Sequence, residues 1–312
     1  MAASAWAEEV DESATPTPDP VVDLLSVELL KSGVRVYGEQ AFSVLADFGP
    51  ADASEFRSTL GVRASAPLDD SFALRASVVA QASFFDYDGD LAGLEADLGG
   101  VDLFQRLFDT RFALGGIYRL PLNGSVFGLT TTWSVFGEGR AELGWEDGAS
   151  LGDAVSGSGA LGVGFELAPH LQIALGVSVG SRIDEGGVNV SPVVGFRWRI
   201  RDGMRLASQG TGLLFAMDLL PELELQLRAS YESERYRLDD GDAPPMDLTL
   251  RKRDVPVLVA LRWSPTRHWR ITGGAGSVVY QKWRVEVDDD GGSSSVDAGP
   301  AALLVLRAEY RF

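Results

Sequence analysis

Long stretches in which apolar and polar residues alternate dominate the sequence from residue 34 onward. Between residues 71 and 85, the even-numbered positions are apolar, whereas Arg75 and Gln81 fall among the odd-numbered ones. A period of two is typical of β-strands with one apolar and one polar face. The stretches run to 12 residues or more, as in 71–85, 124–140 and 222–238. Strands of soluble proteins usually have about 5–6 residues, whereas a tilted strand needs about 9–11 to cross a bilayer, so these lengths favour membrane-crossing strands.

The connections between these stretches are alternately short and long. The short ones contain Pro, Gly, Asn or Asp and lie at 67–70, 121–124, 168–170, 201–203, 220–222 and 264–268; the long ones are acidic and rich in glycine and lie at 86–108, 141–154, 239–254 and 288–299. Outer-membrane barrels pair short periplasmic turns with longer extracellular loops in this way. We therefore predict one all-β, transmembrane, antiparallel up-and-down barrel over residues 34–312.

The same rule gives the number of strands. Counting alternating segments gives an odd total, whereas a single-chain bacterial barrel has an even number. In addition, the short turns at 201–203 and 220–222 would lie on one side of the membrane with a single strand between them. A brief extra strand at 204–209 resolves both problems. The prediction is about 14 strands, and about 12 is the alternative if the weaker segments are not strands.

Composition excludes several classes of function. The chain has 45 acidic and 27 basic side chains, a net charge of −18 and no cysteine. Binding to nucleic acid depends on Lys and Arg neutralising phosphates, so this balance argues against a nucleic-acid partner. The lack of cysteine removes disulfides, thiolate catalysis and cysteine-ligated metals. No apolar run approaches the roughly 18 residues of a transmembrane helix.

Many arginines fall on the polar side of the alternating segments, which in a membrane barrel faces the lumen. The predicted lumen-lining set comprises Arg57, Arg63, Arg75, Arg111, Arg119, Arg182, Arg197, Arg199, Arg228, Arg262, Arg307, Glu166, Glu224, Glu232 and Glu309, with Glu55, Glu138, Glu222 and Glu234 on the same side. Opposed charges at a constriction screen solutes, so this set is predicted to select small solutes in a porin-like channel or transporter. Barrels of about 8 strands are filled by side chains and those of 16–18 are open, so the sequence leaves open whether the lumen is a narrow pore or is plugged.

Two N-terminal segments precede the alternating region. Residues 1–20 are interpreted as a signal-peptide remnant, ending in the small-x-small sequence at 5–7, followed by a disordered linker of acidic residues, threonine and proline. Residues 21–33 contain regularly placed Val and Leu and are predicted to form a plug in the lumen or a periplasmic segment. A plug would favour gated transport over passive conductance.

The last strand ends in an aromatic residue that is in register with the apolar face. Counting back in twos from Phe312 gives Tyr310, Ala308, Leu306 and Leu304, with charged residues between them. This end resembles the C-terminal strand of Gram-negative outer-membrane barrels, and the pattern over about 34–312 resembles uncharacterised barrel families of that membrane. The resemblance implies an outer-membrane location among lipid and lipopolysaccharide, and an assembly signal at Tyr310 and Phe312 that the barrel-assembly machinery reads. It implies no reaction.

Motifs that carry chemistry are few, and we predict no catalytic residue and no cofactor. The two histidines, His170 and His268, fall in predicted periplasmic turns, away from the outer rim where a membrane hydrolase meets its substrates. Asp86, Asp88 and Asp90 alternate before a long loop, but their spacing departs from an EF-hand loop, so they are weak candidates for a divalent cation. The alternative function is therefore a non-conducting structural or surface-interaction barrel whose acidic loops bind cations; a hydrolase ranks below it.

Overall fold

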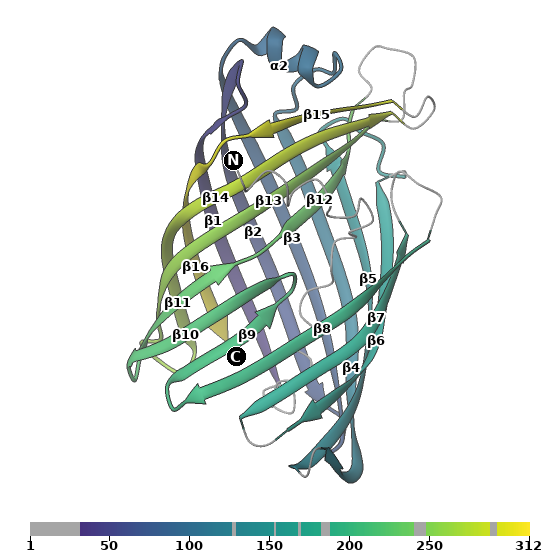
Figure 1. Cartoon of the computed structure of the whole chain (residues 1–312), viewed down its shortest axis with the longest axis vertical. Coiled ribbons are helices and arrows are strands. Elements are labelled where there is room, and N and C mark those ends of the chain that lie inside the picture. Colours follow the sequence, from purple (N-terminus) through teal and green to yellow (C-terminus); the bar gives the residue numbers. More distant parts are fainter. Residues whose placement is uncertain are drawn as a thin grey trace.

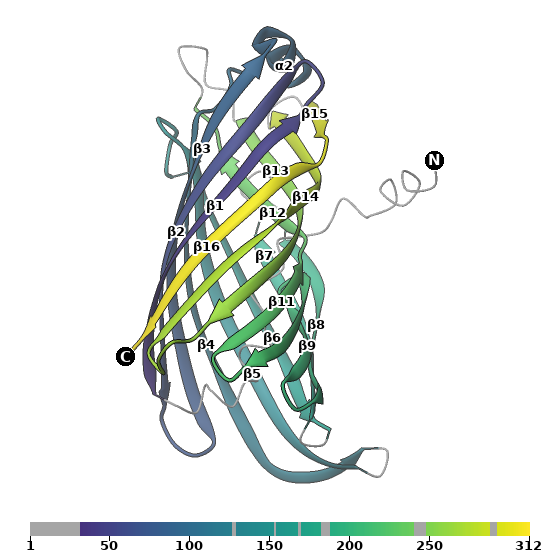
Figure 2. The same cartoon turned by 90° about the vertical axis from the view of Figure 1, so that its left-hand side faces the viewer.

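The computed structural model describes residues 32–126, 129–152, 154–167, 170–181, 188–239, 248–287 and 292–312. These residues form one antiparallel sheet that is rolled into a closed barrel (Figures 1 and 2). Its strands are β1 (Gly33–Asp47), β2 (Ala51–Pro67), β3 (Phe72–Gly89), β4 (Arg106–Val126), β5 (Leu129–Glu146), β6 (Val155–Glu166), β7 (Leu171–Ser181), β8 (Val188–Arg201), β9 (Met204–Gln209), β10 (Gly212–Leu220), β11 (Leu223–Ala229), β12 (Glu232–Arg237), β13 (Leu248–Trp263), β14 (Trp269–Val287), β15 (Ser293–Ala298) and β16 (Ala301–Arg311). A short helix, α2 (Leu91–Asp97), follows β3.

The barrel wall has 14 strands. Consecutive strands pair from β1 to β11, and β13, β14 and β16 then lead back to β1. β12 continues β11 along the same neighbour, β13, and β15 continues β16 along β14, so neither adds a position to the ring. The predicted barrel of 14 strands is confirmed, and the alternative of about 12 is wrong. The brief strand predicted at 204–209 is β9.

Some predicted connections are wrong in detail. The turn expected at 121–124 belongs to β4, which pairs with β5 again from Asn123 to Val126 after an irregularity that follows Arg119. The loop expected at 288–299 contains β15, and the loop expected at 86–108 contains the end of β3 and α2. Residues 1–31 lie outside the described residues, so the leader and most of the predicted plug at 21–33 cannot be compared; Gly33 is the first residue of β1.

The two ends of the barrel differ. The connections β2–β3, β8–β9 and β13–β14 lie at one end with the C-terminus, which we call the turn end. Helix α2 and the connection β3–β4 lie at the other, which we call the loop end (Figure 1). None of the helices in the described residues has the length and apolar character needed to cross a membrane.

Large apolar side chains cover the outer face of the wall. Exposed examples on β2, β4, β6, β8 and β16 are Leu60, Leu114, Leu161, Val194 and Leu306. An apolar surface that surrounds a monomer is unfavourable in water but is the lipid-facing band of a membrane barrel. The wall therefore has the predicted arrangement, in which apolar residues face outward and charged residues face inward.

At the loop end, β12 leaves the wall and lies inside the barrel. Its residues 233–237 are buried on both faces, and Arg237 forms a bridge with Trp145 of β5. Gly144 makes this contact possible, because a Cβ at that position would clash with the carbonyl oxygen of Arg235. β12 therefore closes a smaller ring against β5, which partitions the loop-end half of the barrel.

The strand β8 marks the other side of this partition. It pairs with β7 from Val188 to Trp198, whereas its described pairing with β9 covers only Arg197–Arg201. The next strands, β9 and β10, are short. As a result, the loop-end part of β8, from Val188 to Phe196, has a described strand partner on one side only.

Candidate functional site

The predicted lumen residues lie on the inner side of the wall wherever the structure describes them. On β2, for example, Arg57 and Arg63 alternate with the outward Leu60 and Val62, and on β8 Arg197 and Arg199 alternate with the outward Trp198. Arg182 lies outside the described residues, so its position stays a prediction. Glu222 lies exposed in the turn before β11, and Glu232 and Glu234 lie on β12 inside the barrel.

On the inner face, side chains of β9, β11 and β13 meet around Glu224. Its carboxylate contacts the guanidinium of Arg205 at 2.5 Å and that of Arg262 at 2.7 Å. Gln226 donates to the same carboxylate at 2.5 Å and accepts from Arg228 Nε at 3.0 Å. One buried carboxylate therefore organises several cations on adjoining strands, where charge-assisted hydrogen bonds are strong.

A second group lies where β16 meets β1 and β14. Glu309 contacts Arg311 at 2.9 Å and Arg270 at 3.6 Å, and Arg307 reaches Glu39 at 3.5 Å. The Arg307 guanidinium also lies 4.0 Å from the centre of the Tyr37 ring, a cation–π geometry. The ring of Tyr37 covers Gly61 on β2, where a Cβ would overlap with it.

Arginines far outnumber carboxylates on this part of the lumen, which we call the arginine-rich lumen. Among the described residues, the inward cations are Arg35, Arg63, Arg75, Arg119, Arg140, Arg197, Arg199, Arg205, Arg228, Arg262, Arg270, Arg307 and Arg311, whereas the inward carboxylates are Glu39, Glu138, Glu166, Asp218, Glu224 and Glu309. The described lining of this part of the lumen therefore has a positive net charge, although the whole chain has a net charge of −18. A water-filled lumen lined in this way attracts anions and repels cations.

Toward the loop end, the net charge of the described side chains that line the lumen changes from positive to negative. We call this group of side chains the buried charge network. Its centre is Glu234 on β12, which accepts hydrogen bonds from Tyr236 at 2.8 Å, Gln81 at 3.0 Å and Arg111 at 3.1 Å. Arg111 also contacts Asp109 at 2.8 Å and Glu142 at 3.3 Å. β12 is thereby tied to β3, β4 and β5 across the inside of the barrel.

Lys252 on β13 holds the other part of this network. Its ammonium group contacts Glu55 at 2.5 Å and Asp254 at 3.2 Å, and its side chain is 1% exposed. Arg57 contacts Glu232 at 3.2 Å and Glu55 at 3.5 Å. Carboxylates outnumber cations here, and the pairs span β2, β12 and β13.

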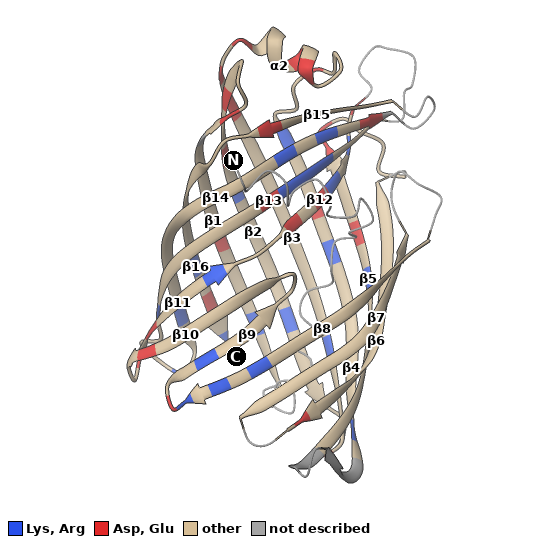
Figure 3. Cartoon of the chain, in the orientation of Figure 1, with Lys and Arg blue, Asp and Glu red and all other residues tan. Residues whose placement is uncertain are grey.

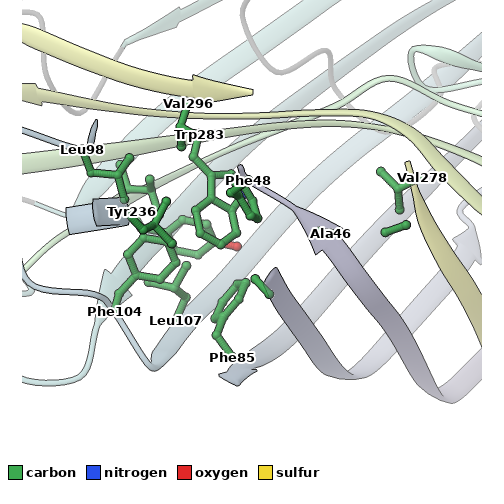
Figure 4. Close-up of a cluster of buried hydrophobic side chains, with 14 of the residues drawn as sticks. Ala46, Phe48, Phe85, Leu98, Phe104, Leu107, Tyr236, Val278, Trp283 and Val296 are labelled. Carbon is green, nitrogen blue, oxygen red and sulfur yellow. The ribbon is translucent and has the colours of Figure 1, made fainter. Parts of the chain in front are cut away.

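Beyond the charges, an apolar plug fills the loop end of the lumen (Figure 4). The plug comprises Phe48, Phe85, Leu94, Leu98, Phe104, Tyr236, Leu250 and Trp283 with smaller neighbours. The Trp283 ring lies 4.2 Å from that of Phe48, 5.0 Å from that of Phe104 and 5.5 Å from that of Phe85, measured between centroids. Strands β3, β12, β13 and β14, helix α2 and the connections β1–β2 and α2–β4 provide these side chains, so the plug fills the part of the loop end that β12 separates off.

Sequence reasoning missed part of the lining. Arg205, Arg270 and Arg311 follow the same alternation as the predicted residues and could have been found by extending it. Lys252 could not be found in that way, because the segment 239–254 was assigned to a loop, whereas β13 begins at Leu248.

The weak cation candidates do not gather into a site. Asp86, Asp88 and Asp90 are exposed, and Asp90 caps α2 by accepting a hydrogen bond from the Gly93 amide at 3.1 Å. Across the described ranges, the structure contains no group of three or more potential metal-ligating side chains. His268 lies in a turn at the turn end, with Nδ1 2.9 Å from the Arg311 carbonyl oxygen.

No family model and no curated protein sequence matches the chain. Among solved structures, the chain is similar to an outer membrane channel from Pseudomonas putida F1, with a TM-score of 0.45 and 12% identity over 97% of this chain and 98% of that one. It is also similar to the P. putida toluene transporter TodX, with a TM-score of 0.40 and 12% identity over 96% and 94% of the two chains. For the KdgM porin the TM-score is 0.32 and the identity 9%, over 89% and 99%. These likenesses concern the fold.

Proposed function

We propose that the chain is an outer-membrane channel for small anionic solutes and that the arginine-rich lumen is its selectivity element. The observation that carries this proposal is the excess of inward arginines in a chain of net charge −18. An acidic protein that places 13 of its 27 basic side chains on one inner surface creates a positive potential where a solute would pass. The predicted set, including Arg197, Arg199, Arg228 and Arg262, belongs to this element.

The apolar plug defines how such a channel works. Solutes that enter from the turn end meet the arginines first and then reach the buried charge network and the plug. Passage along the barrel axis requires the plug to move. The proposal is therefore a selective channel with a closed axis, rather than a wide passive pore.

Replacing both Arg197 and Arg199 by glutamate is expected to lower the ratio of chloride to potassium permeability about fivefold or more. Each exchange reverses a charge on the inner face of β8, and about 1 kcal/mol per close charge in water corresponds to that factor. The ratio is obtained from reversal potentials of the refolded protein in planar bilayers under a salt gradient. The shift should shrink at high salt because of screening.

The matched control is Arg106→Gln, since this arginine lies at the loop end with its side chain 57% exposed, paired with Asp147. It should leave the permeability ratio unchanged. Cation selectivity in the wild type would contradict the proposal. So would absence of conductance in the wild type and in a variant with a loosened plug, which would favour the non-conducting structural barrel.

The proposal includes outer-membrane assembly through the terminal strand, with lipid and lipopolysaccharide around the wall. Phe312 is 73% exposed, and its ring lies 4.8 Å from that of Tyr310, measured between centroids. Replacing Phe312 by alanine should therefore change unfolding free energy by less than about 1 kcal/mol, yet lower the amount of barrel in the outer membrane strongly. The amount is measured by quantifying folded barrel in isolated outer membranes.

Phe112→Ala is the control for this experiment, because Phe112 is a comparably accessible phenylalanine of the outer wall, 45% exposed. If both variants reach the outer membrane in equal amounts, the terminal aromatic residue is not an assembly signal in this chain.

A further inference from the structure

The lumen-facing side chains of β12 belong to both the buried charge network and the apolar plug. Glu234 accepts a hydrogen bond from Arg111 of β4 at 3.1 Å. Tyr236, two residues further along, donates its hydroxyl to Glu234 at 2.8 Å and packs in the plug. Figure 3 shows the acidic residues of β12 in the loop-end half of the barrel. The attachment of β12 to the wall therefore depends on the charges around Arg111.

Three carboxylates share the guanidinium group of Arg111. Asp109 lies 2.8 Å and Glu142 3.3 Å from its Nε, and Glu234 lies 3.1 Å from its Nη2. These carboxylates come from β4, β5 and β12, so one cation joins three strands. The Asp109 side chain is 1% exposed, that of Glu234 8% and that of Glu142 14%. Solvent and salt screen the repulsion between such buried groups only weakly.

Two of these carboxyl groups are in direct contact with each other. The side chains of Asp109 and Glu142 are joined by a hydrogen bond. An ionised carboxylate only accepts hydrogen bonds, whereas a protonated one has an O–H group to donate. Two carboxylates that share a site do not both ionise freely, because their like charges repel. The contact therefore requires one proton that the pair shares.

The groups that face this pair from β12 and β3 do not replace the proton. Glu234 of β12 adds a further negative charge, and Tyr236 contributes a neutral hydroxyl. Gln81 of β3 lies directly opposite Asp109, is uncharged and donates to Glu234 at 3.0 Å. Arg57 of β2 approaches Glu234 at 3.9 Å. The cation of β2 thus meets β12 rather than the pair.

The groups on β5 and β6 lead to the same result. Arg140 is the inward cation two residues before Glu142 on β5, and it contacts Glu138 at 3.1 Å. Ser156 of β6, which is uncharged, lies directly opposite Glu142. Over the described residues, Arg111 is therefore the cation that contacts both carboxyl groups, and it does so while it also holds β12.

Two buried polar groups beside the network lack hydrogen-bond partners among the described residues. One is Oγ of Ser83, which is 1% exposed and lies on β3 directly opposite Arg57. The other is Oε1 of Gln281, which is 3% exposed and lies on β14 directly opposite Asp254. Buried polar atoms are usually satisfied by protein or by water. These groups therefore indicate that water reaches the network, where it accepts or supplies a proton.

We propose that the carboxyl pair of Asp109 and Glu142 is a pH switch whose shared proton holds β12 inside the barrel. The inference rests on the proposed function, to which it adds control of opening by pH. When the pair gives its proton to water, the O–H bond breaks and its electron pair stays on the carboxylate, so Arg111 faces three full negative charges. Repulsion between the pair and Glu234 then releases β12, and Tyr236 leaves the plug with it. The channel is closed with the proton bound and opens as the pH rises.

Infrared difference spectroscopy of the folded full chain in lipid vesicles tests the shared proton without reference to conductance. A protonated carboxyl group has a C=O stretching band that disappears when the group ionises. Between neutral and alkaline pH, the wild type should lose more of this band than Asp109→Asn or Glu142→Gln, because each substitution puts a neutral amide in place of one member of the pair. The second variant carries the test if the first fails to fold.

The matched control is Glu138→Gln, since Glu138 is a carboxylate on β5 whose side chain is 6% exposed and pairs with Arg140. This variant should lose as much of the band as the wild type does. Equal losses in the wild type and in the folded variants of the pair overturn the switch.

Hydrogen exchange of the β12 backbone amides measures the release of this strand. Because release is coupled to one proton, it should become about tenfold more favourable per pH unit while the pair ionises. At a given alkaline pH the wild type should therefore exchange faster than Asp109→Asn, whereas at acid pH the two should exchange equally. Equal exchange of the two proteins at alkaline pH contradicts the proposal.

Recordings in planar bilayers connect the switch to conduction. The open probability of the wild type should rise with pH by the same factor, whereas Asp109→Asn should stay closed. A conducting wild type whose open probability does not depend on pH overturns the switch. If the infrared band and the exchange of β12 behave as expected while no current flows at any pH, the proposed function fails and the switch stands.

Discussion

Replacing Lys252 by methionine is expected to lower the free energy of unfolding by about 3–5 kcal/mol, the cost of breaking a buried ion pair on one side. The Lys252 ammonium is the group that Glu55 and Asp254 share, at 2.5 Å and 3.2 Å, and its side chain is 1% exposed. Methionine fills a similar volume, so the loss comes from the uncompensated carboxylates rather than from a cavity. Denaturant unfolding of the barrel in lipid vesicles, followed by tryptophan fluorescence, measures the change.

The chain offers a matched control in the next strand. Lys282 is 28% exposed, and its partner Asp297 is 66% exposed at 3.6 Å; exposed pairs of this kind contribute about 0–1 kcal/mol. Lys282→Met should therefore cost little stability. Adding Glu55→Gln to Lys252→Met should recover part of the loss, because one unpaired carboxylate is removed. Equal losses in the two lysine variants would show that the buried charge network does not hold the barrel together.

The alternation of residues was sufficient to predict the wall because a strand with a period of two fixes the side on which each residue lies. Arg57, Arg63 and Arg75 needed only this rule to be placed inward. The requirement for an even number of strands led to the prediction of β9, a strand of 6 residues that hydropathy alone does not reveal. Physical constraints on a closed sheet thus carried more information here than the apolar content of any single segment.

The partition of the loop end could not be predicted from alternation, since β12 keeps the same register with β13 as β11 does. The sequence signal for this partition lies in the residue types at the outward positions of β12. After Tyr231 the outward positions are Ser233, Arg235 and Arg237, a row that cannot face lipid. The segment 222–238 was predicted as one continuous strand, but the loss of its apolar face marks the point at which the chain leaves the membrane-facing wall.

The contact that turns β12 inward depends on a residue far away in the sequence. Gly144 allows the β12 backbone to approach β5, and its role becomes visible only when both strands are placed in space. The plug has the same origin, because Phe48, Phe85, Phe104 and Trp283 belong to separate strands and loops and none of them stands in an apolar run. Packing between distant segments therefore decides whether the lumen is open.

Opening the plug is expected to raise conductance along the barrel axis. Trp283 is 1% exposed and packs on Phe48, Phe85 and Phe104, so Trp283→Ala removes the largest side chain at the closure. The substitution should cost about 3–5 kcal/mol of stability and should give a larger single-channel conductance than the wild type in planar bilayers.

The control for Trp283→Ala is the removal of a tryptophan that does not close the barrel axis. Trp269 stands on the outer wall, 45% exposed, beside Tyr310 at 5.0 Å between centroids, and Trp269→Ala should leave the single-channel conductance at the wild-type value. Folded barrels of both variants are confirmed by their resistance to unfolding in cold dodecyl sulfate before recording. A folded Trp283→Ala variant with wild-type conductance would mean that the aromatic plug is not the barrier on the axis, and the buried charge network beneath it would then be the element that closes the lumen.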